Sequence, residues 1–329
     1  MTWFTWRQFR AQTWVTVAAL GALGILLVVT GRSLAHAYAS TVAACHGDCA
    51  ATMRQFVLEA RDGTNGRVYN LTLGVMYAVP ALIGIFWGAP LFARELETGT
   101  HHLAWTQSVT RTRWLATKLV LVGGAAAATV GLLSWAVTSW AGRVDSAAGD
   151  RITPLLYGAR GVVPIGWAVF AFALGVTLGM LIRRTIPAMV ATAVIYVLAV
   201  TLIPRQRLVP AVHINRPLDM NSTAVMYNDE IHWVWADPST DIVPRDAWLL
   251  ANRSVTPSGT WFNGPKDQRN CPDMDACTQW VGSLGLRQDL TYHPASHFWP
   301  LQWTETGIFV AVAALLVGFC FWRTRRSTR

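Results

Sequence analysis

The sequence has 329 residues, of which 53% are hydrophobic and only 14% are charged. The charges fall in clusters separated by long uncharged stretches, which excludes an ordinary soluble domain. The formal net charge of +9 suits contact with anionic lipid at the edge of these stretches, so it does not call for a nucleic-acid partner.

Six uncharged runs are each about long enough to cross roughly 30 Å of hydrocarbon as a helix. Buried helices of soluble proteins rarely stay uncharged over such lengths and keep a polar stripe. We therefore predict an all-α membrane protein with six transmembrane helices. The predicted spans cover residues 12–31, 68–93, 119–142, 161–182, 185–204 and 306–322.

The distribution of basic residues predicts the orientation, because short cytoplasmic loops retain Arg and Lys during insertion. One alternate set of loops carries twelve basic residues against two acids, Glu95 and Glu97, and the other set carries the remaining fifteen basic residues and sixteen acids. The first set, which includes both termini, is predicted to be cytoplasmic. Arg outnumbers Lys 25 to 2, a usage typical of GC-rich bacterial genomes, so we predict a multi-pass protein of the bacterial plasma membrane.

The first run also fits a signal peptide, because Arg7 and Arg10 precede it and the sequence 35–37 resembles a cleavage site. Its apolar core exceeds the usual signal-peptide length of roughly 7 to 15 residues, and aromatic residues suited to the membrane interface precede it. The run is therefore interpreted as a first membrane span.

Four of the five cysteines fall in predicted outward segments, as two closely spaced pairs. Cys45 and Cys49 flank one short turn, and Cys271 and Cys277 bracket another. Disulfides persist in oxidising compartments, so we predict two of them on the outer side, although spacing alone does not fix which cysteines pair. Cys320 lies inside the sixth run and is predicted to be a packing residue.

The cytoplasmic loop 93–118 contains the sequence Ala-Arg-Glu-Leu-Glu-Thr-Gly-Thr-His-His-Leu-Ala-Trp from residue 93 onward. It offers two carboxylates to a partner's arginine, a glycine that can end a helix and a threonine that can cap the next one. Leu103 and Trp105 suit an apolar socket on a partner. The alternative interpretation is a charged helix end at the membrane surface.

This loop resembles the first cytoplasmic loop of ABC transporter permeases of the type-2 exporter class, in which Arg-Glu-x-Glu-x-Gly-Thr follows the second span. The matching residues are Arg94, Glu95, Glu97, Gly99, Thr100 and Leu103. The resemblance implies that the loop holds a coupling helix, which docks on an ATPase subunit and transmits nucleotide-driven motion to the spans. It also implies a second permease, as a homodimer or a paralogue.

The predicted spans contain no Asp, Glu, Lys, Arg or His, which argues against ion-coupled transport and against an intramembrane hydrolase. No P-loop motif occurs in the chain, so we predict no enzyme activity here, with ATP and Mg²⁺ bound only by the partner subunit. On polarity alone, the cargo path is assigned to Tyr77, Ser134, Thr138 and Tyr196. Such an uncharged path suits a drug, lipid or peptide.

Residues 204–305 lie between the fifth and sixth spans and are rich in Pro, Asp, Asn and Trp. Their number is sufficient for a small extracellular domain, which separates residues 1–203 from the sixth span and basic tail at 306–329. The predicted function is thus the permease subunit of an ATP-driven exporter. The alternative is a membrane-anchored sensor or scaffold whose outer domain binds a ligand or partner, and a third class is an enzyme with its site in that domain.

Overall fold

The computed structural model describes the chain except for residues 1, 48, 98–109, 219–222, 227–232, 237–242, 245, 263–272 and 327–329. The chain forms two compact units. The helical unit comprises residues 1–148, 155–205 and 301–329, and the second unit comprises residues 149–154 and 206–300.

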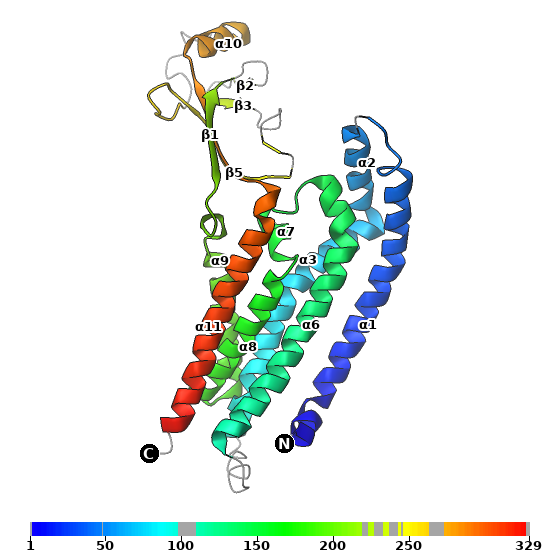
Figure 1. Cartoon of the computed structure of the whole chain (residues 1–329), viewed down its shortest axis with the longest axis vertical. Coiled ribbons are helices and arrows are strands. Elements are labelled where there is room, and N and C mark those ends of the chain that lie inside the picture. Colours follow the sequence, from blue (N-terminus) through cyan, green and yellow to red (C-terminus); the bar gives the residue numbers. More distant parts are fainter. Residues whose placement is uncertain are drawn as a thin grey trace. The chain divides into compact units, whose positions relative to one another are not determined.

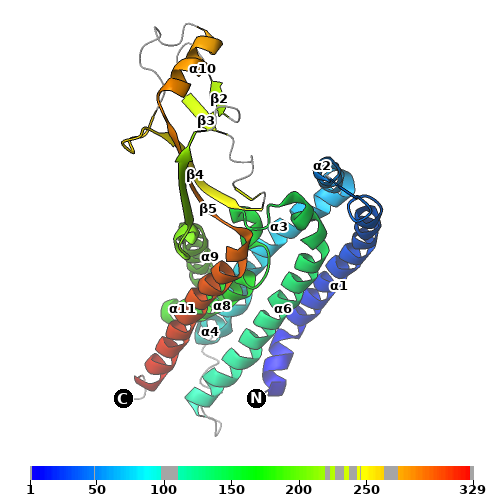
Figure 2. The ribbon, with the colours of Figure 1, turned by 45° about the horizontal axis from the view of Figure 1, so that its top comes forward.

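The helical unit is a bundle of long helices that run side by side (Figures 1 and 2). Within the described residues, six helical segments of this unit are long and apolar enough to cross a membrane, as predicted. The elements are α1 (Thr2–Ser40), α2 (Ala50–Ala60), α3 (Gly63–Ile83), the π-helix η1 (Gly84–Gly88), α4 (Ala89–Glu97), α6 (Arg111–Ala148), α7 (Pro154–Gly158), α8 (Val163–Ile182), α9 (Thr185–Leu202) and α11 (Phe298–Arg326). Of these, α3, η1 and α4 together make one of the six segments.

Helix α8 is the centre of this bundle. It is hydrophobic on all sides, and 67% of its most apolar window is buried, against 11% for α1 and 22% for α9. A helix with no polar stripe is stable only where apolar groups surround it completely. Helices α3, α4 and α6 pack against α8, while α1 and α9 leave much of their apolar surface for the bilayer or a partner.

The second unit corrects the prediction of an all-α protein. It contains η2 (Arg205–Arg207, which begins at the boundary), β1 (Val212–Pro217), β2 (Thr223–Met226), β3 (Trp233–Ala236), β4 (Trp248–Val255), α10 (Met274–Ser283), β5 (Arg287–His293) and η5 (Ala295–His297). The strands form an antiparallel sheet in the order β1-β5-β4 and a two-stranded antiparallel sheet of β2 and β3. Hydropathy spacing identified the spans but carried no clear strand alternation in this region.

The central strand β5 explains how the three-stranded sheet holds together. Its even-numbered residues Gln288, Leu290 and Tyr292 are buried, while their odd-numbered neighbours from 287 to 291 are partly exposed. Gln288 accepts hydrogen bonds from Arg216 on β1, at 3.0 and 2.8 Å, and donates one to Asn252 on β4, at 3.1 Å. These bonds satisfy a fully buried amide and tie all three strands together.

Candidate functional site

The predicted coupling loop leaves α4 and returns into α6 at one end of the helical unit. Arg94, Glu95 and Glu97 lie on α4, and Arg94 is exposed. The other four predicted coupling residues, Gly99, Thr100, Leu103 and Trp105, lie outside the described residues. The described part of the site therefore consists of the end of α4 and the start of α6, which flank the loop in the chain, together with the start of α9.

Glu95 joins α4 to α6 through a buried ion pair with Lys118. Glu95 is 8% exposed and Lys118 is 2% exposed. The Lys118 ammonium also lies over the rings of Phe92, at 5.4 Å, and Trp114, at 4.8 Å. Charges buried this far are retained only when paired, and the two aromatic faces add attraction for the cation. Glu95 thus faces the interior, which corrects the expectation that it is offered to a partner's arginine.

Glu97 joins the same end of α4 to α9. Its Oε2 accepts hydrogen bonds from the Thr185 amide, at 3.0 Å, and from the Thr185 hydroxyl, at 2.7 Å. Thr185 is the first residue of α9, so the carboxylate satisfies an unpaired amide and complements the positive end of the helix dipole. The side chain remains exposed. Both predicted carboxylates therefore connect α4 to another span within this chain.

Four glycines allow η1 and the start of α4 to pack closely against α8. A side chain at Gly88 would meet the Phe172 carbonyl oxygen at 2.6 Å, and one at Gly179 would meet the Ala89 carbonyl oxygen at 2.5 Å. Gly84 and Gly175 are equally constrained, so each helix contributes two glycines spaced by four, the arrangement that permits close backbone approach in membranes. The backbones of η1, the start of α4 and α8 are therefore in close contact, without side chains between them at these four positions.

The residues assigned to the cargo path make hydrogen bonds between helices. Ser134 Oγ donates to the Gly161 carbonyl at 2.5 Å, and Thr138 Oγ1 accepts from the Gly161 amide at 3.2 Å. Tyr77 donates to the Leu155 carbonyl at 3.0 Å, and Tyr196 donates to the Tyr77 carbonyl at 3.4 Å. Ser134, Thr138 and Tyr77 thus converge on residues 155–161, the connection into α8. Their polarity is accounted for by this packing role.

Two further buried ion pairs lie at the other end of the helical unit, and the sequence analysis missed them. Asp145 pairs with Arg160 at 2.8 Å, and Glu305 pairs with Arg205 at 3.2 Å. Asp145 also accepts a 2.6 Å bond from Tyr69, and Glu305 accepts a 3.0 Å bond from the Trp167 indole. A signal for them exists in the sequence, because Arg160, Arg205 and Glu305 each directly adjoin an uncharged run. The helices extend beyond those runs, so the spans do carry charges, but at their ends.

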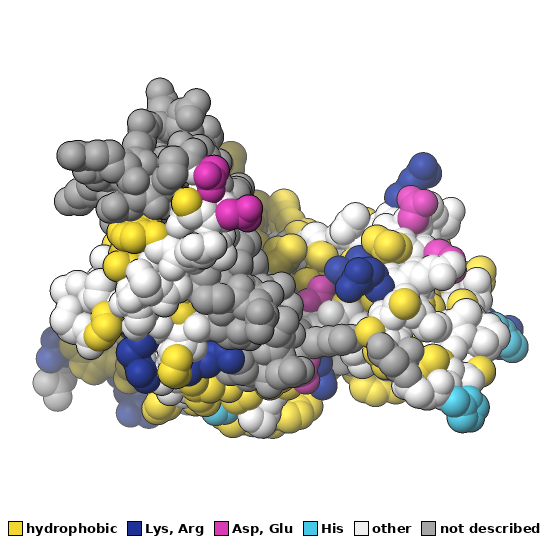
Figure 3. Space-filling model, turned by 90° about the horizontal axis from the view of Figure 1, so that it is seen from above, with side chains coloured by type: hydrophobic (Ala, Val, Ile, Leu, Met, Phe, Trp, Pro, Cys, Tyr) yellow, Lys and Arg dark blue, Asp and Glu magenta, His cyan; other side chains and the backbone are white. Residues whose placement is uncertain are grey.

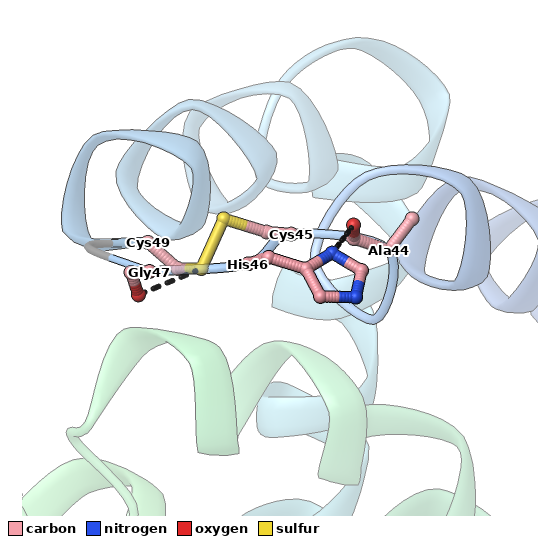
Figure 4. The surroundings of a disulfide bond; sticks show 5 residues. All are labelled: Ala44, Cys45, His46, Gly47 and Cys49. Carbon is pink, nitrogen blue, oxygen red and sulfur yellow. Dashed lines mark hydrogen bonds between the residues drawn. A yellow bond between two sulfur atoms is a disulfide. The ribbon is translucent and has the colours of Figure 1, made fainter.

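The disulfide prediction is confirmed for the first pair. Cys45 and Cys49 form a disulfide in the turn between α1 and α2, where His46 Nδ1 donates a hydrogen bond to the Ala44 carbonyl (Figure 4). Cys277 is also disulfide-bonded, while Cys271 lies outside the described residues. Cys320 is free and buried, at 3.4 Å from the Thr177 hydroxyl, and packs between α8 and α11 as predicted.

The surface seen in Figure 3 shows basic, acidic and hydrophobic side chains interspersed among the described residues. No group of three or more His, Cys, Asp or Glu side chains suited to a metal ion occurs in the part of the chain that the structure describes. The features that stand out are thus the connected end of α4 and the buried ion pairs of the spans.

Comparison with known proteins agrees with the family resemblance inferred from the sequence. No curated protein and no solved structure shows significant similarity to the chain. A family model described as ABC-2 membrane transporter related matches residues 17–207, which is more than half of the chain and includes the first five candidate spans, the loop 93–118 and the connected end of α4. The chain therefore belongs to the ABC-2 membrane transporter related family.

Proposed function

We propose that this chain is the permease subunit of an ATP-driven exporter and that a separate subunit hydrolyses the ATP. The observation that carries the proposal is the double connection at the end of α4, within the region that the family model matches. The segment between Glu97 and Thr110 follows directly on α4, which is bonded to both α6 and α9. A partner that moves this segment displaces three spans together.

The route of this motion follows from the contacts. The Glu95–Lys118 pair carries displacement of α4 into α6, and the Glu97–Thr185 bonds carry it into α9. The glycine contacts carry it into α8. Because packed helices shift as rigid elements, binding energy released at the loop reaches the spans without a charged group inside the hydrocarbon.

The orientation belongs to the same proposal. With the basic loops and both termini in the cytoplasm, the Cys45–Cys49 bond and the second unit lie outside the cell. A stable disulfide is consistent with that oxidising side of a bacterial plasma membrane. The uncharged middle parts of the spans favour a hydrophobic or amphiphilic cargo, such as a drug, lipid or peptide, which passes between this permease and a second one.

The proposal is tested by purifying the tagged chain from native membranes in mild detergent and identifying the proteins that accompany it in near-equal amount. We expect an ATPase with a P-loop and ATP hydrolysis that survives purification. The variant Glu97→Arg should weaken this recovery, and Glu59→Arg, which makes the same charge change at an exposed site on α2, should leave it unchanged. Absence of an ATPase in several detergents would contradict the exporter and favour a membrane-anchored sensor or scaffold.

A further inference from the structure

The second candidate span, Gly63–Glu97, is not one regular helix. It consists of α3, the π-helix η1 and α4, and the Ala89 amide bonds to the Gly84 carbonyl, five residues earlier. Pro80 and Pro90 lie on either side of η1, and each removes one hydrogen bond of the helix because proline has no backbone N–H. Prolines and π-turns are the places where helices bend sharply, often at functional sites. The regular hydrogen bonding of this span is thus interrupted three times around η1.

The two sides of this interruption are bonded to opposite ends of α6. On α3, Tyr69 donates a 2.6 Å hydrogen bond to Asp145, in the last turn of α6. On α4, Glu95 forms its buried ion pair with Lys118, near the start of α6. A displacement of the start of α6 therefore acts on α4, whereas α3 stays bonded to the other end.

Contact with α8 supplies a fixed point between these two bonds. Gly84 and Gly88 are buried, and a side chain at either position would meet a backbone oxygen of α8 at 2.6 Å. A change of angle at such a contact does not require side chains to pass one another, whereas separation of the helices would give up close packing. A span that is held at Tyr69 and at η1 can follow the start of α6 only by bending at η1.

We propose that η1 is a pivot in the second span, at which α4 changes its angle to α3 while the contact with α8 is kept. The pivot is a property of this chain alone, whereas its use in export rests on the proposed function. A partner that displaces the loop end of α4 would bend the span at η1. The displacement is taken up there and does not load the buried Asp145–Arg160 pair at the other end of the unit.

The test measures distances across η1 in the purified full chain, in lipid nanodiscs without an ATPase. Spin labels are attached at Leu71→Cys on α3 and Arg94→Cys on α4, both exposed sites, with Cys320 changed to Ala and the disulfides left oxidised. The matched pair is Val120→Cys and Arg143→Cys, which are exposed, lie on the regular helix α6 and are also 23 residues apart. We expect the distance distribution across η1 to be about twice as wide as that along α6, because a pivot adds a range of angles to ordinary helix bending.

Two variants stiffen the pivot from opposite sides, so one remains informative if the other does not fold. Pro80→Ala and Pro90→Ala each restore an amide to the helix and should narrow the distribution across η1 toward that of α6. Pro164→Ala is the control, because Pro164 lies in the first turn of α8, where a proline removes no helical hydrogen bond. Equal widths for the two labelled pairs, or no narrowing in either stiffened variant, would overturn the proposal. No ATPase is present, so the result is independent of whether the chain recruits one.

Discussion

The two ends of the helical unit are both held by carboxylates, but in different environments. At the end that carries the family-specific loop, Glu95 is buried against Lys118 while Glu97 is exposed on Thr185. At the other end, Asp145 and Glu305 are both buried, each against an arginine. An exposed bond exchanges readily with water, whereas a buried ion pair is costly to break. The comparison indicates that the exposed contact between α4 and α9 can open when a partner binds, whereas the buried pairs at the other end hold the bundle together.

The largest effect is expected from Asp145→Asn, which keeps the shape of the side chain and removes its charge. Arg160 is fully buried, so it would be left as an uncompensated cation. We expect the variant to lose stability toward the upper end of the roughly 3–5 kcal/mol typical of a broken buried pair. Thermal unfolding of the detergent-solubilised chain measures this, with Asp62→Asn at an exposed site as control. Equal midpoints for the two variants would contradict the holding role.

A somewhat smaller loss is expected from Lys118→Met, because Glu95 retains some contact with solvent. The cost should lie near 3 kcal/mol, about the lower end of the same range. The double variant Glu95→Gln, Lys118→Met removes both charges and should recover most of the stability. Arg113→Met, at an exposed site on the same helix, serves as the control. A double variant that is less stable than Lys118→Met would refute the pairing as the source of the effect.

Glu97→Arg tests the exposed contact between α4 and α9, and it should affect docking of the ATPase more than the stability of the chain. It removes the acceptor at the start of α9 and places a cation where the positive end of the helix dipole lies. We expect normal insertion, weaker recovery of the ATPase during purification and reduced export. Glu59→Arg is again the control. Unchanged recovery together with unchanged export would remove the coupling assignment.

The smallest expected effect is a pH dependence of stability in the second unit. Burial lowers the pKa of His293, on β5, from its ordinary value of 6.5. The Nδ1 atoms of His293 and His297 lie 3.1 Å apart, and His293 Nε2 donates a hydrogen bond to the Gln206 carbonyl at 3.2 Å. The unfolded chain then binds more protons than the folded one, so stability rises with pH. The contribution is present above about pH 6.5 and is lost as pH falls below it.

Hydrogen exchange of β5 in the intact chain measures this dependence. Protection of the strand should weaken from pH 7 to 5 beyond the intrinsic change in exchange rate, and His293→Gln should abolish the excess. His213→Asn is the control, because His213 is an exposed partner of Asp289 on the same sheet. An excess that persists in His293→Gln would assign the pH sensitivity to another group.

The residues at the end of α4 show which features of the site could be predicted from the sequence and which could not. The spacing of Arg94, Glu95 and Glu97 identified the loop, but their partners Lys118 and Thr185 lie 23 and 88 residues further along the chain. A charge beside an uncharged run looks the same whether it faces solvent or another helix. Likewise, Ser134 and Thr138 carried a polar signal that fits a transport path and a packing contact equally well, and nothing in the sequence indicates that both side chains bond to Gly161.

The sequence by itself determined the membrane class, the number of candidate spans, the family and the first disulfide. Each of these depends on local composition or short spacing, because hydrocarbon thickness sets the span length and small loops bring cysteines together. The tertiary structure decided which charges are buried in pairs and that residues 206–300 include two β-sheets. These features depend on contacts between residues far apart in the chain, which no local pattern encodes.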